Sequence, residues 1–168
     1  MAASPPLNTM AKKTAKKQPK LARQALSFAR NRLKQSRVPA LLGFHVEKLS
    51  HGKAILSMQV RDLHKQIHDV VHGGVIAALA DTAAAIAVYT VIPRGAEIAT
   101  VELKINYLSA VPGGKIKAIG TVLRAGRNFV ITECEVIDAK GNLAAKALLT
   151  FGAIAGTSLE RPSRQLQN

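Results

Sequence analysis

Cysteine, aromatic residues and a leader segment are scarce or missing in this chain of 168 residues, and each absence excludes a class of protein. Cys134 is the single cysteine, so no intrachain disulfide can form, and we expect a reducing, cytoplasmic setting. Tryptophan is absent and aromatic residues make up 4% of the chain, so the stacking platforms of single-strand nucleic-acid binders are missing. The sequence shows no N-terminal apolar core followed by a small-residue cleavage site, so we expect no signal peptide.

Several motifs of catalysis and ligand binding are missing as well. There is no Gly-x-Ser-x-Gly elbow, and "PGGK" at 112–115 lacks the spacing and the Ser or Thr of a phosphate loop. His64, His68 and His72 follow one another at intervals of four, but no Cys or Glu completes a metal-ligand set. We therefore predict an ordinary polar loop without a metal, and a core thiol rather than a nucleophile at Cys134.

Basic residues are abundant, but they are concentrated near the N-terminus. The net charge is +14, and the first 46 residues hold ten of the 24 Lys and Arg residues and none of the ten acids. Residues 1–20 are rich in Lys, Ala and Pro, which predicts a solvated, disordered tail, and residues 157–168 form a second predicted tail. Nucleic acid or another anionic surface stays open as a partner of the basic tail.

Hydrophobic periodicity divides the rest of the chain into helices and strands. Residues 21–36 place apolar side chains at spacings of three and four, which predicts an amphipathic helix. Residues 43–61 contain two short β-type runs around a Ser-His-Gly turn and predict a hairpin. Four more runs with strand character are separated by turn residues: 97–109, 113–125, 128–139 and 142–154.

Between these strand regions lies a segment of twenty residues, 73–92, that is mostly Ala and other apolar residues and is followed by Pro93. Its length fits a bilayer, but Asp81 near its centre and the lack of aromatic belts argue against a transmembrane helix. A helix that is apolar all round has to be covered by protein. We therefore predict one α+β domain over residues 38–156, in which an antiparallel sheet of about six strands wraps this helix.

Asp81 needs an explanation, because carboxylates are rarely buried without a partner. Gly73 and Gly74 open the same predicted helix, where unpaired N–H groups and the helix dipole favour a developing negative charge. Together they would provide a base and a carbonyl-polarising donor. Gly73 and Asp81 are eight residues apart, roughly 12 Å along a helix, so one carbonyl carbon could be reached by both only if they belong to different subunits.

Three stretches together resemble the hotdog-fold acyl-CoA thioesterases of the phenylacetic-acid-degradation (PaaI-type) group. These are "VVHGGVIAALADTAAAIA", "ATVELKINYLSAV" and "RAGRNFVITECEVIDAKGNLAAKALLTF", and the resemblance covers residues 38–154. It implies a hotdog fold, active sites at a subunit interface, assembly as a dimer or as a dimer of dimers (a homotetramer), and no cofactor apart from the coenzyme A of the substrate. The expected reaction is hydrolysis of a small aryl- or short/medium-chain acyl-CoA to free acid and CoA.

The resemblance also implies roles for particular residues. Asp81 matches the catalytic carboxylate, as nucleophile or as general base, and Gly73 matches the backbone donor to the thioester oxygen. Thr100 is expected to orient the attacking water, and Gln66 stands where close relatives often have Asn. The expected substrate-binding residues are His72, Gly74, Arg124 and Arg127. The alternative is a non-catalytic acyl-CoA-binding or regulatory hotdog protein, in which Asp81 would be a buried structural acid.

Overall fold

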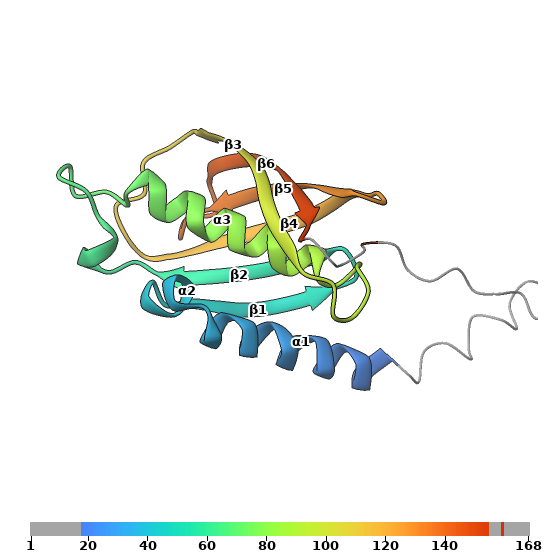
Figure 1. The fold of residues 1–168 in the computed structure, drawn as a ribbon. Coiled ribbons are helices and arrows are strands. Elements are labelled where there is room, and N and C mark those ends of the chain that lie inside the picture. Colours follow the sequence, from blue (N-terminus) through green and yellow to red (C-terminus); the bar gives the residue numbers. More distant parts are fainter. Residues whose placement is uncertain (1–17, 155–158, 160–168) are drawn as a thin grey trace, which may run out of the picture.

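The structure is a computed structural model that describes residues 18–154 and Leu159. Within these residues the chain forms the elements labelled in Figure 1: α1 (Gln18–Gln35), α2 (Arg37–Leu41), β1 (Phe44–Ser50), β2 (Lys53–Gln59), the 3-10 turn η1 (Asp62–His64), α3 (Gly73–Val88), β3 (Ile98–Tyr107), β4 (Lys115–Ala125), β5 (Phe129–Ile137) and β6 (Leu143–Ala153). The strands form one antiparallel sheet in the order β1-β2-β4-β5-β6-β3. This arrangement confirms the predicted α+β hotdog architecture.

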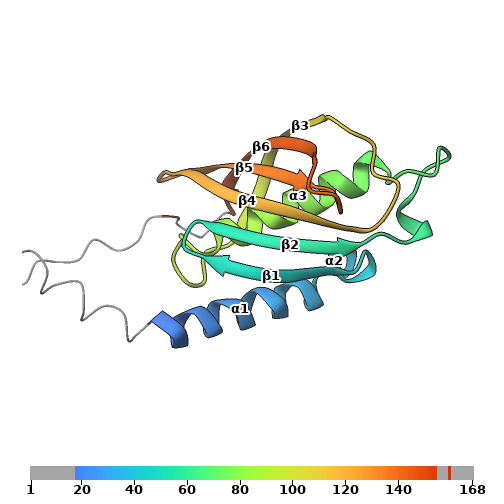
Figure 2. The same ribbon diagram turned by 180° about the vertical axis from the view of Figure 1, so that it is seen from behind.

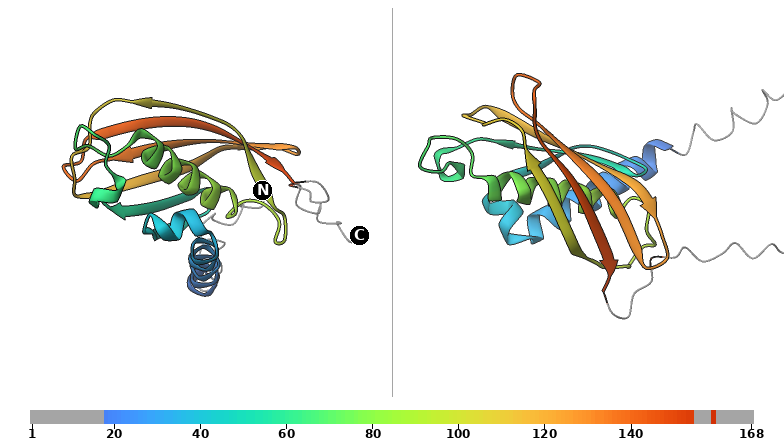
Figure 3. Two further views of the ribbon diagram at one scale, coloured as in Figure 1. Left: turned by 60° about the vertical axis from the view of Figure 1, so that its left-hand side comes forward. Right: turned by 90° about the horizontal axis from the view of Figure 1, so that it is seen from above.

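The sheet curves around α3, so that the helix lies in its hollow (Figure 3). The side of α3 that faces the sheet consists of small apolar side chains without solvent exposure: Leu79, Ala80, Ala83, Ala84 and Ala87. At Gly120 of β4 an added Cβ would lie 2.6 Å from the Ala83 carbonyl oxygen, which is closer than side chains allow. Because neither residue carries bulk at this contact, the backbone of α3 lies directly on the sheet.

The two edges of the sheet differ. Helix α1 runs along β1 and packs on it, and Ala29 and Leu33 of α1 are buried (Figures 1 and 2). Strand β3 pairs with β6 on one side and is the other edge of the sheet. Its side chains are largely exposed, including 61% of Val101 and 50% of Tyr107. An edge strand with exposed apolar groups can pair with a strand of another chain.

The end of α3 and the presence of α2 differ from the sequence-based prediction. The helix ends at Val88, where the backbone changes to turns in which the N–H groups of Thr90 and Val91 donate to the carbonyls of Ala87 and Val88. The hydroxyl of Thr90 donates a 2.7 Å hydrogen bond to the Ala87 carbonyl at this end. Helix α2 has five residues, too few for a periodic pattern to indicate it.

The histidine-containing segment is a loop, as predicted. His64 ends the 3-10 turn and is buried, and a tight hairpin follows in which Lys65 pairs with Val71. Cys134 is fully buried, as the alternation of β5 predicts, and burial raises the pKa of its thiol to about 12. Among the described residues, no helix combines the length and the apolar character that crossing a membrane requires.

The predicted tails lie mostly outside the described residues. Of residues 1–20 the structure describes the last three, which belong to α1, so this helix begins three residues before the predicted range of 21–36. Of residues 157–168 it describes Leu159, which is buried. The disordered character of the N-terminal tail and the assignment of residues 157–168 as a second tail stay predictions.

Candidate active site

The carboxylate of Asp81 is paired with a hydroxyl of the edge strand. Asp81 is partly buried in the middle of α3, and Thr100 Oγ1 of β3 donates a 2.8 Å hydrogen bond to its Oδ1. Burial raises the pKa of Asp81, and the Thr100 hydrogen bond lowers it by a smaller amount. A carboxylate in this environment is more basic than one in water, and one of its oxygens has an oriented neighbour.

A β-bulge brings Thr100 to Asp81. Leu103 and Ile105 of β3 are half-buried toward α3, and strict alternation from them would turn Thr100 outward. The register of β3 against β6 shifts between Thr100 and Glu102, and such an extra residue reverses the facing of the residues before it. Thr100 therefore shares the inner face of β3, from which it contacts Asp81.

Asp81 and Thr100 line a pocket of about 250 Å³. Its walls come from α1, α2, α3, β3 and β6, and apolar side chains such as Leu33, Ile86 and Phe151 line much of it. A larger hollow of about 590 Å³ lies at the turn between β1 and β2, and none of the predicted site residues lines it. We place the candidate active site in the smaller pocket because it contains the carboxylate with the raised pKa.

The start of α3 forms a second group of predicted site residues. His72 is the N-cap, and its Nδ1 accepts a 2.9 Å hydrogen bond from the Gly74 N–H. The Gly73 N–H has no partner among the described residues, as expected at a first helical position. Tyr107 was not predicted here: its hydroxyl donates to the Gly73 carbonyl over 2.9 Å, and a Cβ on Gly73 would lie 3.1 Å from its ring. Gly73 thus combines a free donor with a close contact, which a larger residue could occupy only if the Tyr107 side chain shifted slightly.

One chain does not bring these two groups together. The eight residues from Gly73 to Asp81 on α3 correspond to roughly 12 Å along the axis. Gln66 belongs to the Gly73 end, because it lies in the hairpin before α3, where its N–H donates to the Val70 carbonyl over 2.8 Å. Within a single chain, therefore, Thr100 is the predicted catalytic residue that contacts Asp81.

Arg124 and Arg127 lie in a third place. They belong to the end of β4 and to the hairpin between β4 and β5, which projects at the opposite end of the molecule from the start of α3 (Figures 1 and 2).

Nowhere in the described ranges do three or more His, Cys, Asp or Glu side chains gather closely enough to hold a metal ion.

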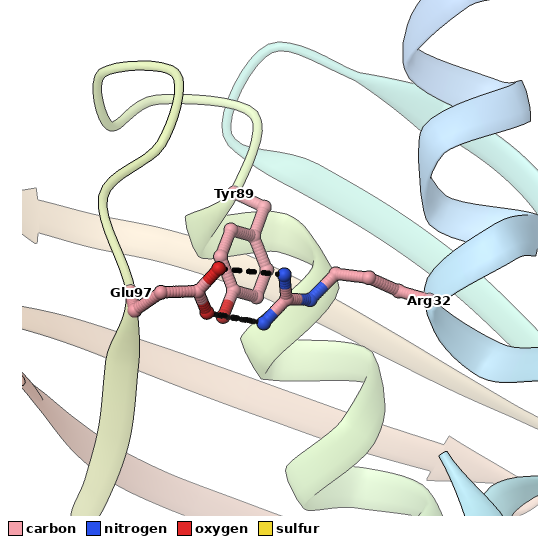
Figure 4. Close-up of polar contacts among 3 residues, drawn as sticks. All are labelled: Arg32, Tyr89 and Glu97. Carbon is pink, nitrogen blue, oxygen red and sulfur yellow. Dashed lines mark hydrogen bonds and ion pairs between the residues drawn. The ribbon is translucent and has the colours of Figure 1, made fainter. Parts of the chain in front are cut away.

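A cluster of three polar residues lies at one end of the pocket, where two of them, Arg32 and Tyr89, line it, and the sequence did not predict this cluster. We call Arg32, Tyr89 and Glu97 the Arg32 clamp (Figure 4). Arg32 comes from α1, Tyr89 caps α3, and Glu97 precedes β3, so these contacts join three elements. The one signal in the sequence is that Tyr89 is the only ionisable residue besides Asp81 in the apolar segment.

Comparison with known proteins gives this chain a family. The model of the thioesterase superfamily matches residues 68–145, which include the start of α3, Asp81 and Thr100. A protein of Saccharolobus solfataricus named "Putative esterase" is 31% identical over 128 residues, covering 76% of this chain and 85% of that protein. The 1,4-dihydroxy-2-naphthoyl-CoA hydrolase of Escherichia coli is 22% identical and covers 73% of this chain and 90% of that enzyme.

A solved structure shares the fold. The PaaI protein of the phenylacetic acid degradation operon of E. coli superposes with a TM-score of 0.74 at 23% identity, covering 82% of this chain and 98% of that one. The family model and the sequence relatives indicate one superfamily, and the solved structure shares its fold. The chain therefore belongs to the thioesterase superfamily, which confirms the expected enzyme class, a thioester hydrolase.

Proposed function

We propose that the protein is a PaaI-type acyl-CoA thioesterase that hydrolyses a small aryl- or short/medium-chain acyl-CoA to the free acid and CoA. The observation that carries this proposal is the carboxylate of Asp81, which lies on the wall of a pocket that apolar and polar side chains line in similar proportion and whose pKa is raised by burial. A base of raised pKa suits attack on a thioester, and the apolar part of the pocket wall, such as Ile86 and Phe151, can contact the acyl group. The relative that hydrolyses 1,4-dihydroxy-2-naphthoyl-CoA supports a CoA thioester as the substrate.

Asp81 acts in one of two ways in this proposal. As a general base, it accepts a proton from a water molecule whose oxygen attacks the carbonyl carbon, the C–S bond breaks, and the thiolate of CoA takes up the proton. As a nucleophile, its oxygen attacks the same carbon, the C–S bond breaks and CoA leaves as the thiolate, so that a mixed anhydride forms. Water then hydrolyses the anhydride to the free acid and the Asp81 carboxylate, and the proton that is released neutralises the thiolate. In both cases Thr100 orients one carboxylate oxygen, so that the other is directed at the substrate or the water.

The carbonyl oxygen is polarised in this proposal by the Gly73 N–H of a neighbouring subunit. The distance along α3 favours two chains, and the open edge of β3 next to Asp81 is the surface through which a second copy would bring its own helix close. The complete assembly in our proposal is a dimer or a homotetramer. Its shared site would also include Gln66 beside Gly73.

The remaining residues of the proposed site bind the substrate. His72 and Gly74 shape the donor end, while Arg124 and Arg127 supply positive charge for the phosphates of CoA. The chemistry described above requires no cofactor, because coenzyme A arrives as part of the substrate. We also place the enzyme in the cytoplasm, where its single thiol would stay reduced.

The test is the release of free CoA by Asp81→Asn, with the exposed Asp62→Asn as the matched control. Asn is nearly isosteric but neither attacks nor accepts a proton at neutral pH. We expect Asp81→Asn to unfold at the wild-type temperature and to lose roughly 10²–10⁴-fold in kcat, the usual contribution of a general base. Asp62→Asn keeps wild-type turnover. Near-wild-type turnover by Asp81→Asn would contradict the catalytic role of Asp81, and binding of acyl-CoA without release of CoA by the wild type would favour a binding protein.

A further inference from the structure

The pocket of Asp81 extends along α3 away from the carboxylate. On α3 it is lined from Asp81 to Tyr89, eight residues or roughly 12 Å further along the helix. Helix α1 supplies the facing wall with Arg32 and Leu33, and Ser36 continues it at the junction with α2. An acyl group attached to a carbonyl at Asp81 would therefore point toward Tyr89 and lie beside α1.

The Arg32 clamp holds this wall in place. Arg32 Nη1 donates a 2.9 Å hydrogen bond to Glu97 Oε1, and Nη2 donates to Glu97 Oε2 and, over 2.5 Å, to the Tyr89 hydroxyl. The Tyr89 hydroxyl in turn donates to Glu97 Oε2 over 2.9 Å. The bidentate pairing of the Arg32 guanidinium with the Glu97 carboxylate fixes the relative orientation of the two groups as well as the distance between them.

Aromatic contacts fix the same guanidinium from its faces. Arg32 Cζ lies 4.1 Å from the centroid of the Tyr89 ring and 5.7 Å from that of Phe28, which also belongs to α1. The two rings meet edge to face at 5.8 Å. The clamp is partly open to solvent, with 32% of the Arg32 side chain and 42% of the Glu97 side chain exposed. Its effect is therefore to set the position of α1 more than to stabilise the whole fold.

Apolar packing alone gives α1 a modest anchor. Among its described side chains, Ala29 and Leu33 are buried and Leu26 is partly buried, while the exposed fraction of Phe28 is 48%. An anchor of small and medium side chains lets a helix shift when its polar contacts are lost. The position of the wall therefore depends on Arg32 and Glu97.

We propose that α1, held by the Arg32 clamp, is the wall that limits the size of the acyl group, so that the enzyme selects acyl groups of about one aromatic ring over long chains. This inference rests on the proposed thioesterase function. The pocket volume of about 250 Å³ compares with the cavity of roughly 150 Å³ that holds one benzene molecule, which leaves room for a ring and a short linker. A long chain would have to displace α1.

The test compares acyl groups on single preparations of full-length protein. Benzoyl-CoA and decanoyl-CoA are hydrolysed by wild type and by two clamp variants, Arg32→Met and Glu97→Gln, which keep much of each side chain's shape. Arg30→Met removes an exposed arginine of the same helix and serves as the matched control. The readout is the ratio of kcat/KM for decanoyl-CoA to that for benzoyl-CoA, which does not depend on the active fraction of a preparation.

We expect wild type and Arg30→Met to favour benzoyl-CoA, and both clamp variants to raise the decanoyl-to-benzoyl ratio roughly tenfold, which is within the range that a pocket wall contributes. A second variant narrows the pocket: Ser36→Phe adds a ring at a position that makes no side-chain capping bond. It should lower kcat/KM for benzoyl-CoA relative to acetyl-CoA.

The outcomes separate this inference from the function beneath it. If no acyl-CoA is hydrolysed, or if Asp81→Asn is fully active, the proposed function fails. If hydrolysis depends on Asp81 but the clamp variants keep the wild-type decanoyl-to-benzoyl ratio, the size-limiting role of α1 is wrong. An unchanged benzoyl-to-acetyl ratio in Ser36→Phe would also refute that role.

Discussion

Two inactive variants should regain activity when they are mixed, provided that Gly73 and Asp81 act across a subunit interface. Gly73→Pro removes the donor N–H, and proline is well suited to a first helical turn. His72 before it is extended, with φ −61° and ψ 133°, as a residue that precedes proline prefers. The control is Gly73→Ala, which meets Tyr107 as closely through its Cβ but keeps the N–H.

The size of the recovery follows from counting sites. After joint unfolding and reassembly of equal amounts of Gly73→Pro and Asp81→Asn, random pairing makes about half of the dimers mixed. In each mixed dimer one site combines an intact Gly73 with an intact Asp81, and the other site has neither. Roughly a quarter of the wild-type activity should therefore return under two-fold symmetric pairing.

The assay is the release of free CoA, measured beside native mass spectrometry of the mixture. Gly73→Ala reports the cost of crowding Tyr107, so the further loss in Gly73→Pro measures the donor itself. If mixed dimers of folded chains form and no activity returns, each site uses a single chain, and the proposed role of the Gly73 N–H is refuted.

Two further predictions concern single side chains. Thr100→Val should move the acid limb of the pH–rate profile to higher pH, because the hydrogen bond that it removes lowers the pKa of Asp81 and the reactive carboxylate is lost as pH falls through that pKa. Thr100→Ser keeps the hydroxyl and should keep the wild-type acid limb. An unshifted acid limb in Thr100→Val would exclude this contact from the working enzyme. Gly120→Ala should lower the free energy of unfolding, measured in urea, by about 1–3 kcal/mol, because the added Cβ would overlap the Ala83 carbonyl. The control Gly113→Ala, whose Cβ would have no heavy atom within 4 Å, should be as stable as wild type. Equal stabilities of the two variants would show that α3 does not pack directly on β4.

The elements of the fold were predictable because their signals are local. The Ala-rich run that forms α3 and the turn residues between the last four strands act within a few positions. The order of the strands depends on contacts between distant parts of the chain, because β3 pairs with β6 at the far edge of the sheet rather than with β4, the next strand in sequence. Alternation shows which face of a strand is buried and leaves its neighbour undetermined.

The site was predictable only in part, for the same reason. Asp81 is visible as a lone charge in an apolar run, and Gly73 as the start of a helix. The contact between Thr100 and Asp81 depends on a bulge that no residue pattern in β3 indicates. The Arg32 clamp joins residues 65 positions apart, and their meeting depends on how α1 packs on the finished domain.

The unequal edges of the sheet also determine how far the chain can assemble through its strands. An exposed edge accepts a neighbour, and a chain with two exposed edges can add neighbours without end, as in fibres. In this chain β3 is open, while α1 lies along β1. Two copies joined at β3 would present β1 with its covering helix at both outer ends. Polymerisation by strand addition would then stop at a pair, which would keep a protein with a long, exposed edge strand from forming fibres at high concentration.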